Sequence, residues 1–533
     1  MDNFDPFFVD AIWLSIAFAG GLLAKRIGLP PLVGFLLGGF IINFSGFHQG
    51  QIYSAVEAMS DIGVMLLLFT IGLKLKLKTL FKKEIWATAT IHIVLTILAL
   101  SGVFTLLTFS GLQLFTGLTF TSSLMISFAL SFSSTVFVVK SLESRGEFES
   151  YHGKLAIGIL IIQDIFAVLF ITFSDNKLPS LWVFTLPILL WVLKKLLSKI
   201  LNTLEHGEMI PVFGFFATFI AGAFSFSFFG LKPDLGALII GMLLVNHPRV
   251  DELYKRMVEY KDFFLIAFFI NVGLIGLPSS STVLTAIILL PLVVFKGVLF
   301  LLILSRFQLQ PRTAFLGALS LSNFSEFGLI VGVVGLNIGL INEEWLVALA
   351  LLMAFSFAIS APLSNYSHVI FDKFKFWILK INQNTKGEDC EPVDFGNAEY
   401  LVIGLGSVGK PAYDTLQTEY GQKVLGLDYN TELIEQLGQK RSNVKWADST
   451  DSELWDKVDS SKLKAVFLTM SEEETNLNIL KAINRINNRS FKIFTICHYP
   501  DQKVKYLNEG AHFVFDYKNY LGKDYVEQSL NQL

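Results

Sequence analysis

The chain has 533 residues, of which 53% are hydrophobic and only 16% are charged. Soluble proteins carry about 25% charged residues, so this composition excludes a wholly soluble protein. A mean hydropathy of +0.56 indicates many membrane spans. The net charge of -3 says little because the charge is unevenly distributed: residues 1–370 form long apolar runs, whereas residues 380–533 are polar and indicate a soluble domain.

The apolar runs are long enough to cross a membrane many times. A span takes about 20 apolar residues, and on this basis we expect about thirteen spans. Their expected limits are 7–25, 30–46, 57–75, 84–108, 114–141, 152–173, 181–203, 209–229, 231–247, 261–277, 281–306, 312–338 and 344–367. Every loop rich in Lys and Arg follows an odd-numbered span. Because such loops stay in the cytoplasm, we expect the N-terminus outside and the C-terminal domain in the cytoplasm.

Two of these spans contain polar interruptions. Span 5 holds a Ser- and Thr-rich stretch that ends at Ser131–Thr135, and span 12 holds a Ser-, Asn- and Gly-containing stretch over 320–328. Unwound backbone at membrane depth is tolerated only where it lines a protein cavity. Paired interrupted spans in the two halves of a chain are typical of a transporter site built from inverted repeats. The plainer alternative is that these small residues allow close packing of helices.

The pair Gln163-Asp164 lies in the middle of apolar span 6, directly after the first interruption. A carboxylate at this depth is costly, and such residues usually face the bundle interior and mark an ion or proton path. Asp164 can hold a proton or a dehydrated cation, but not both, which is the basis of an antiporter. We expect neutral oxygens around the cation from Gln163 and from the interruption; the latter's residues are Ser133, Ser134 and Thr135. The alternative is a plain interhelical hydrogen bond.

Two further charged residues lie within the apolar spans. Lys296 is central in span 11, and a buried ammonium requires a partner. It is either a salt-bridge partner of Asp164 or a charge that stabilises a helix break, and Glu326 in the second interruption is another candidate partner. We expect Glu326 to neutralise positive charge near the crossing of the interrupted spans.

The polar C-terminal part has the pattern of a dinucleotide-binding fold. After a linker over 371–396, an apolar strand precedes Gly404-x-Gly406-x-x-Gly409, and an acidic residue, Asp428, ends the next strand. Such glycines let the backbone approach a phosphate at a helix N-terminus, and the acidic residue binds ribose hydroxyls. Ser407 and Val408 complete the loop, and Asp448 follows a third strand, predicted over 444–447. Two further apolar runs, 465–470 and 492–496, predict a fourth and a fifth strand. No second substrate domain follows, so we expect a nucleotide sensor over 397–533 rather than an enzyme.

These stretches together resemble the second monovalent cation:proton antiporter family, and within it the Kef-type potassium efflux proteins. The resemblance rests on the apolar runs 26–39, 66–75, 133–140, 156–165 and 268–273 and on Glu326-Phe-Gly. The C-terminal part is similar to an RCK (TrkA-N) domain. The Gln-Asp pair resembles the potassium-exchanging branch of the family. The loop over 246–256 is mixed in charge, whereas the glutathione-gated members are acidic there, which argues against gating by glutathione.

The resemblance implies a homodimer with a dimerisation domain and a moving core of spans 5, 6, 12 and 13. It also implies elevator-type alternating access and a bound nucleotide in the RCK domain, either AMP or NAD(H). We therefore expect a polytopic α-helical exchanger domain over 1–370 in the bacterial inner membrane, surrounded by lipid, with a cytoplasmic Rossmann-like regulatory domain.

The preferred function is electroneutral K+/H+ antiport, with K+ bound at Asp164. A Na+/H+ antiporter with the same site and a nucleotide-gated cation channel are the alternatives. We expect no nucleic-acid partner. The direction of flux, the effect of the nucleotide and any accessory subunit stay open.

Overall fold

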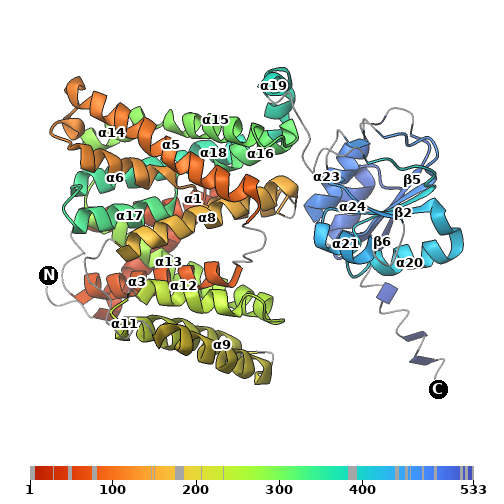
Figure 1. Ribbon diagram of the computed structural model, residues 1–533, viewed down its shortest axis with the longest axis horizontal. Helices are drawn as coiled ribbons and strands as arrows, with labels where there is room; N and C mark the ends of the chain where they lie inside the picture. The colour runs from red at the N-terminus through yellow and green to blue at the C-terminus, as the bar shows by residue number, and fades with distance from the viewer. Residues whose placement is uncertain are drawn as a thin grey trace. The chain divides into compact units, whose positions relative to one another are not determined.

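The computed structural model places most of the chain (Figure 1). It describes residues 6–27, 29–45, 51–74, 81–145, 147–148, 150, 151–173, 185–205, 207–231, 233–381, 393–438, 443–450, 454–455, 458–470, 473–484, 486, 489–516, 520–521, 526–527 and 529–530. The chain forms two compact units. The first comprises residues 1–138, 155–307 and 315–376, and the second comprises 139–154, 308–314 and 377–533.

In the part of the first unit that the structure describes, the regular elements are all helices. Their bounds are α1 Pro6–Arg26, α2 Pro31–Ser45, α3 Gln51–Lys74, α5 Lys83–Leu107, α6 Phe120–Ser131, α7 Thr135–Ser144, α8 Tyr151–Phe173, α9 Leu186–Thr203, α10 Met209–Phe215, η4 Phe216–Phe224, α11 Ser225–Phe228, α12 Pro233–Leu244, α13 Val250–Ile275, α14 Ser280–Leu289, α15 Leu292–Ser305, α16 Pro311–Leu321, α17 Glu326–Asn337 and α18 Glu343–Asn365. Helix α19, Ser367–Ile381, follows them, and η1 (Thr108–Ser110) and η2 (Gln113–Phe115) are single 3-10 turns. The segment η4 is a π-helix inside the expected eighth span.

Both expected interruptions are present. Helix α6 ends at Ser131 and α7 begins at Thr135, while α16 ends at Leu321 and α17 begins at Glu326 with a bend of 43° between them. Each expected span contains a helix, but α12 has only 12 residues. Within the described residues, seven helices are long and apolar enough to cross a membrane, or eight if the bent pair α16–α17 is one span. The count of thirteen therefore stays a prediction.

The helices of the first unit pack in two groups; Figure 1 shows α3, α12 and α13 on one side of α8, and α5, α14 and α15 on the other. One group joins α2, α3, α12 and α13, with α1 against α2 and η4 against α12; the other joins α5, α6, α14, α15, α17 and α18. Pairs of glycines mark the close approaches in the first group, because a Cβ on either glycine would meet the opposing backbone. These pairs are Gly20 with Gly34, Gly39 with Gly273, Gly72 with Gly241 and Gly222 with Gly236.

The second unit contains a six-stranded parallel sheet. Its strands are β1 Tyr400–Ile403, β2 Val424–Asp428, β3 Val444–Trp446, β4 Ala465–Leu468, β5 Lys492–Cys497 and β6 Phe513–Asp516. They lie in the order β3-β2-β1-β4-β5-β6, the doubly wound arrangement in which a ligand binds where the strand order reverses. The first five strands fall where the sequence predicts them, and β6 is an additional edge strand.

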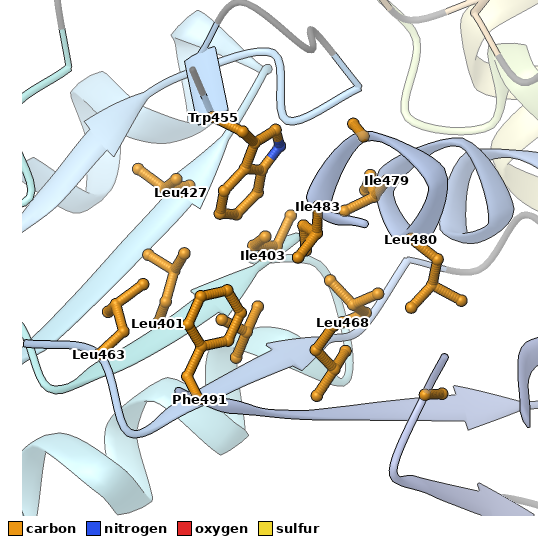
Figure 2. Packing of buried hydrophobic residues seen from close by; sticks show 14 of the residues in the cluster. Leu401, Ile403, Leu427, Trp455, Leu463, Leu468, Ile479, Leu480, Ile483 and Phe491 are labelled. Carbon is orange, nitrogen blue, oxygen red and sulfur yellow. The ribbon is translucent and has the colours of Figure 1, made fainter. Parts of the chain in front are cut away.

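Helices cover the sheet on both faces. On one face α23 (Glu473–Ile483) packs with its Ile479, Leu480 and Ile483 against the strands, as Figure 2 shows. Helix α24 (Pro500–Asn508) adds Tyr506 to the same cluster. On the other face α20 (Gly409–Tyr420) and α21 (Thr431–Gly438) pack against β1 and β2, with Tyr413 fully buried between them. This packing fixes the loop between β1 and α20.

Candidate functional site

Asp164 lies on α8, and only 1% of its surface is exposed. Its Oδ2 accepts a hydrogen bond of 3.0 Å from the hydroxyl of Thr135, the first residue of α7. Its Oδ1 is buried and has no hydrogen-bond partner. A buried carboxylate oxygen without a partner is costly and needs an explanation, such as a proton or a cation that occupies it. Asp164 thus has one oxygen held in place and one oxygen available.

Gln163 and the first interruption hold one another in place. The Oε1 of Gln163 accepts a hydrogen bond of 2.9 Å from the backbone N–H of Ser133, and its amide nitrogen lies 3.5 Å from the carbonyl oxygen of Ser131. Helices leave backbone groups unsatisfied at their ends, and here a side chain from α8 satisfies them. A carbonyl oxygen has two lone pairs, so the Gln163 oxygen retains capacity for another contact.

The two interruptions contact each other directly. The hydroxyl of Ser133 donates to the carbonyl oxygen of Leu321 at 2.7 Å. The backbone N–H of Ser134 donates to Oδ1 of Asn323 at 2.7 Å, and the hydroxyl of Ser134 donates to Oε2 of Glu326 at 2.7 Å. Residues almost 200 positions apart therefore share one polar cluster beside Asp164.

Lys296 lies on α15, is fully buried, and contacts both interruptions. Its Nζ donates to the carbonyl oxygen of Phe132 at 2.6 Å and to that of Asn323 at 2.8 Å, and it lies 4.9 Å from the ring centre of Phe324. Phe132 is the C-cap of α6, where a cation interacts favourably with the helix dipole. Of the two expectations for Lys296, these contacts are those of a charge at a helix break.

Glu326 is the first residue of α17, and the helix N-terminus stabilises a negative charge there. One of its oxygens, Oε1, is buried without a partner. Asp164 and Glu326 interact electrostatically. The cluster therefore presents two carboxyl groups, each with one available oxygen.

The sequence analysis did not single out three residues of the site. Asn323 bridges the two interruptions through its side chain and its backbone. Ser356 and Ser360 on α18 hold the second interruption: Oγ of Ser356 accepts from the N–H of Phe324 at 3.1 Å, and Ser360 donates to the carbonyl oxygen of Ser322 at 2.7 Å. Their spacing of four along one helix face is the signal that could have found the serines.

The glycine-rich loop of the second unit has a shape that fits a nucleotide phosphate. Gly404 has a φ of +90°, in the left-handed region, and Gly409 is so close to the carbonyl oxygen of Gly404 that a Cβ would overlap it. Gly406, in contrast, faces open space, because a Cβ at this position would have no atom within 4 Å. Gly406 and Ser407 are exposed, Val408 is half-buried, and no side chain caps the N-terminus of α20. These are the conditions for backbone N–H groups to bind a phosphate.

The two acidic residues of the lobe differ in their surroundings. Asp428 ends β2, where Oδ2 accepts from the N–H of Leu405 at 2.7 Å and Oδ1 accepts from the N–H of Asn430 at 2.8 Å. Asp428 thus lies against the glycine-rich loop, and its binding of ribose hydroxyls stays a prediction. Asp448 instead accepts from the backbone N–H of Thr450 at 3.0 Å and from its hydroxyl at 2.6 Å, and so closes its own turn.

Comparison with known proteins places the chain. Residues 14–365 match the family model described as "Sodium/hydrogen exchanger, transmembrane", and residues 400–516 match the model described as "TrkA-N domain". The chain therefore belongs to the sodium/hydrogen exchanger family. It is a multi-pass membrane protein of the cation/proton antiporter class and carries a C-terminal TrkA-N domain with a nucleotide-binding fold.

The chain is also similar to individual proteins of known name. The chain is 24% identical to the glutathione-regulated potassium-efflux system protein KefC of Shigella flexneri, over 86% of this chain and 75% of that protein. It is 30% identical to the iron transporter MagA of Paramagnetospirillum magneticum, over 62% of this chain and 78% of that protein. The solved sodium proton antiporter MjNhaP1 from Methanocaldococcus jannaschii shares 14% identity, with a TM-score of 0.48, over 68% of this chain and 97% of its own. The predicted resemblance to Kef-type proteins with an RCK (TrkA-N) domain is confirmed.

Proposed function

We propose that the protein is an electroneutral K+/H+ antiporter in which Asp164 binds a proton and K+ in turn. The observation that carries this proposal is the buried, unpartnered Oδ1 of Asp164, next to a helix interruption whose hydroxyl and carbonyl oxygens are close by. One carboxylate cannot hold both ligands at the same time, so the release of one is linked to the binding of the other. One exchangeable carboxylate gives one-for-one exchange.

Neutral oxygens support K+ as the cation. Thr135 contacts Asp164 directly, Gln163 is its neighbour on α8, and Ser133 and Ser134 complete the interruption. K+ is weakly hydrated, so it loses its water more readily than Na+ to uncharged hydroxyl and carbonyl oxygens. The similarity to a named potassium-efflux protein, KefC, supports the same choice.

Lys296 and Glu326 balance charge in the core. The amine of Lys296 holds two carbonyl groups of the interruptions, and Glu326 accepts from Ser134. In this role they keep the crossing closed while Asp164 changes its ligand. The division of the first unit into two helix groups supports alternating access of the elevator type, in which one group carries the site past the other. A homodimer in the bacterial inner membrane, with the N-terminus outside, completes this proposal.

The RCK domain regulates exchange by binding AMP or NAD(H). The open backbone at Gly406, the uncapped N-terminus of α20 and Asp428 beside the loop support binding of a phosphate and a ribose. Asp448 serves the same ligand from the end of β3. Adding AMP or NADH to proteoliposomes should change the exchange rate, and Gly406→Ala should remove this response while exchange without nucleotide continues.

The central test is Asp164→Asn in proteoliposomes with an imposed pH gradient. Exchange driven by K+ should fall at least about 100-fold, because an amide holds neither a titrating proton nor a cation charge. Asp251→Asn is the matched control, because it makes the same chemical change at an exposed position in the first turn of α13. Size-exclusion chromatography checks that both variants stay folded.

The outcomes separate the alternatives. Proton-coupled K+ flux in Asp164→Asn at a rate near that of the wild type would refute the mechanism. Parallel assays with Na+, Rb+ and Li+ give the selectivity, and faster exchange of Na+ than of K+ would favour a sodium exchanger. Currents far above carrier rates in a planar bilayer would favour a channel.

A further inference from the structure

His92 is a buried titratable residue that the exchange site does not use. It lies on α5 and is completely buried, with Thr88 one turn before it and Thr96 one turn after it. All three face inward, whereas Ile91, Leu95 and Leu98 on the same helix are exposed. A buried polar stripe on one face of a membrane helix usually serves a function, because each polar group there is costly.

The ring of His92 is held by two contacts and leaves one nitrogen available. It stacks on Phe300 of α15, with 3.6 Å between ring centres and 6° between ring planes. Its Nε2 lies 3.4 Å from the hydroxyl of Thr96, and its Nδ1 is buried without a partner. If Nε2 carries the hydrogen, Nδ1 has a free lone pair that can take a proton.

Lys296 is a charged neighbour of His92. It lies one helical turn before Phe300 on α15, and its charge acts electrostatically on His92. Among the other helices near α5, α6 carries no titratable side chain. Helix α8 meets Ile85 at Gly158, and its buried Asp164 interacts with Glu326. On α5 itself, Glu84 and Lys83 lie two turns before His92.

We propose that His92 is a second proton-binding residue of the exchanger, and that a proton on its Nδ1 repels the Lys296 amine from the carbonyl groups it holds. This inference rests on the proposed exchange function and adds an acid limit to it. Two positive charges that interact in a low-dielectric interior repel strongly. The repulsion loosens the hydrogen bonds from Lys296 to Phe132 and Asn323, which join the two interruptions. Exchange therefore slows in acid.

The test compares pH profiles of exchange in proteoliposomes from about pH 4 to about pH 8, a range that extends below the usual titration of an imidazole. His92→Gln removes the titration, and His92→Phe also keeps an aromatic ring on Phe300. Relative to each protein's own rate at the alkaline end, both variants should keep a rate at the acid end about threefold or more above that of the wild type. Thr96→Val is the matched control: it removes the Nε2 contact but keeps the imidazole, so the decline in acid should remain. A purely structural role for His92 would change the rate at every pH by the same factor.

A second measurement does not depend on transport. Nitrogen-15 spectra of histidine-labelled protein in lipid, with His92→Gln used to assign the signal, follow the protonation of His92. The His92 signal should change at a higher pH in Lys296→Gln than in the wild type, because the repelling charge is gone. The proposal is overturned if the profiles of His92→Gln and His92→Phe superimpose on the wild type, or if the Lys296→Gln signal changes at the same pH. If the wild type shows no exchange at all, the proposed function fails, and the spectra alone decide this inference.

Discussion

At the crossing of the interrupted spans side chains occupy the ends of helices, whereas at the glycine-rich loop of the lobe the helix end is left open. Lys296 donates to the C-cap of α6, and Ser325 caps α17 by accepting from Phe327. In the lobe, α20 begins without a side-chain cap, and Gly406 faces open space. Among the described residues of the crossing, the buried carboxylate oxygens without a hydrogen-bond partner are Oδ1 of Asp164 and Oε1 of Glu326. The site proposed for a small ion and the site proposed for a phosphate thus use helix ends in opposite ways.

Substitutions of glycines in the lobe test this comparison with the largest expected effect. Gly409→Ala would place a Cβ on the carbonyl oxygen of Gly404 and close to the hydroxyl of Thr469. We expect the cost to exceed the roughly 3 kcal/mol typical of overpacking, since backbone cannot give way as a side chain can. Gly406→Ala is the matched control for folding, because its Cβ meets nothing.

Hydrogen exchange of the β1 and β4 peptides in the full-length protein measures the outcome. Gly409→Ala should lose protection there, and Gly406→Ala should keep protection but lose the thermal shift on adding AMP or NADH. Nucleotide binding by Gly406→Ala at wild-type affinity would contradict an open phosphate site at this position.

Lys296→Met tests whether the stability of the crossing depends on the amine that donates hydrogen bonds to its backbone carbonyl groups. The substitution leaves the carbonyl groups of Phe132 and Asn323 without this donor. Each unsatisfied buried group costs about 1–3 kcal/mol, partly offset by removal of the buried amine, so we expect a net loss of about 2–3 kcal/mol. Unfolding of the purified protein in detergent measures it. A Lys296→Met protein as stable as the wild type would show that the two carbonyl groups find other donors.

Gly328→Ala tests the packing beside the crossing. A Cβ at Gly328 would overlap the carbonyl oxygen of Ala129 on α6, and we expect a loss of about 1–2 kcal/mol from overpacking. Gly317→Ala on α16 is the matched control, because its Cβ would lie 3.6 Å from a flexible methyl group of Leu304. Thermal unfolding of the two variants side by side gives the difference, and equal midpoints would argue against a tight contact between α6 and α17.

The smallest effect is expected at Glu399 in the lobe. Hydrogen bonds from Lys423 and Lys464, at 2.7 Å and 2.5 Å, hold the pKa of Glu399 below its usual value. The stability from these contacts is therefore present above the unfolded value of about 4.3 and is lost as the pH falls through the lower folded value. Glu399→Gln should flatten this part of the pH dependence of lobe unfolding. An unchanged slope would show that both lysines are replaceable by water.

The sequence predicted the features that stand out against an apolar background. Gln163-Asp164 and the two interruptions are polar groups within lipid-length runs, and the glycine spacing of the lobe is local, so each could be found without coordinates. The role of Asn323 could not, because its partner Ser134 is 189 residues away. The choice between two roles for Lys296 likewise depended on distances between helices. Strand β6 was missed because it is a four-residue edge strand with Phe513 exposed.

The paired glycines of α1, α2, α3, η4, α12 and α13 have a consequence for motion. Where two backbones touch through facing glycines, sliding one helix by a single residue brings a Cβ onto the opposing main chain. Such contacts fix the register of these six segments relative to their neighbours. A rearrangement that keeps these contacts therefore moves the six segments together as one body.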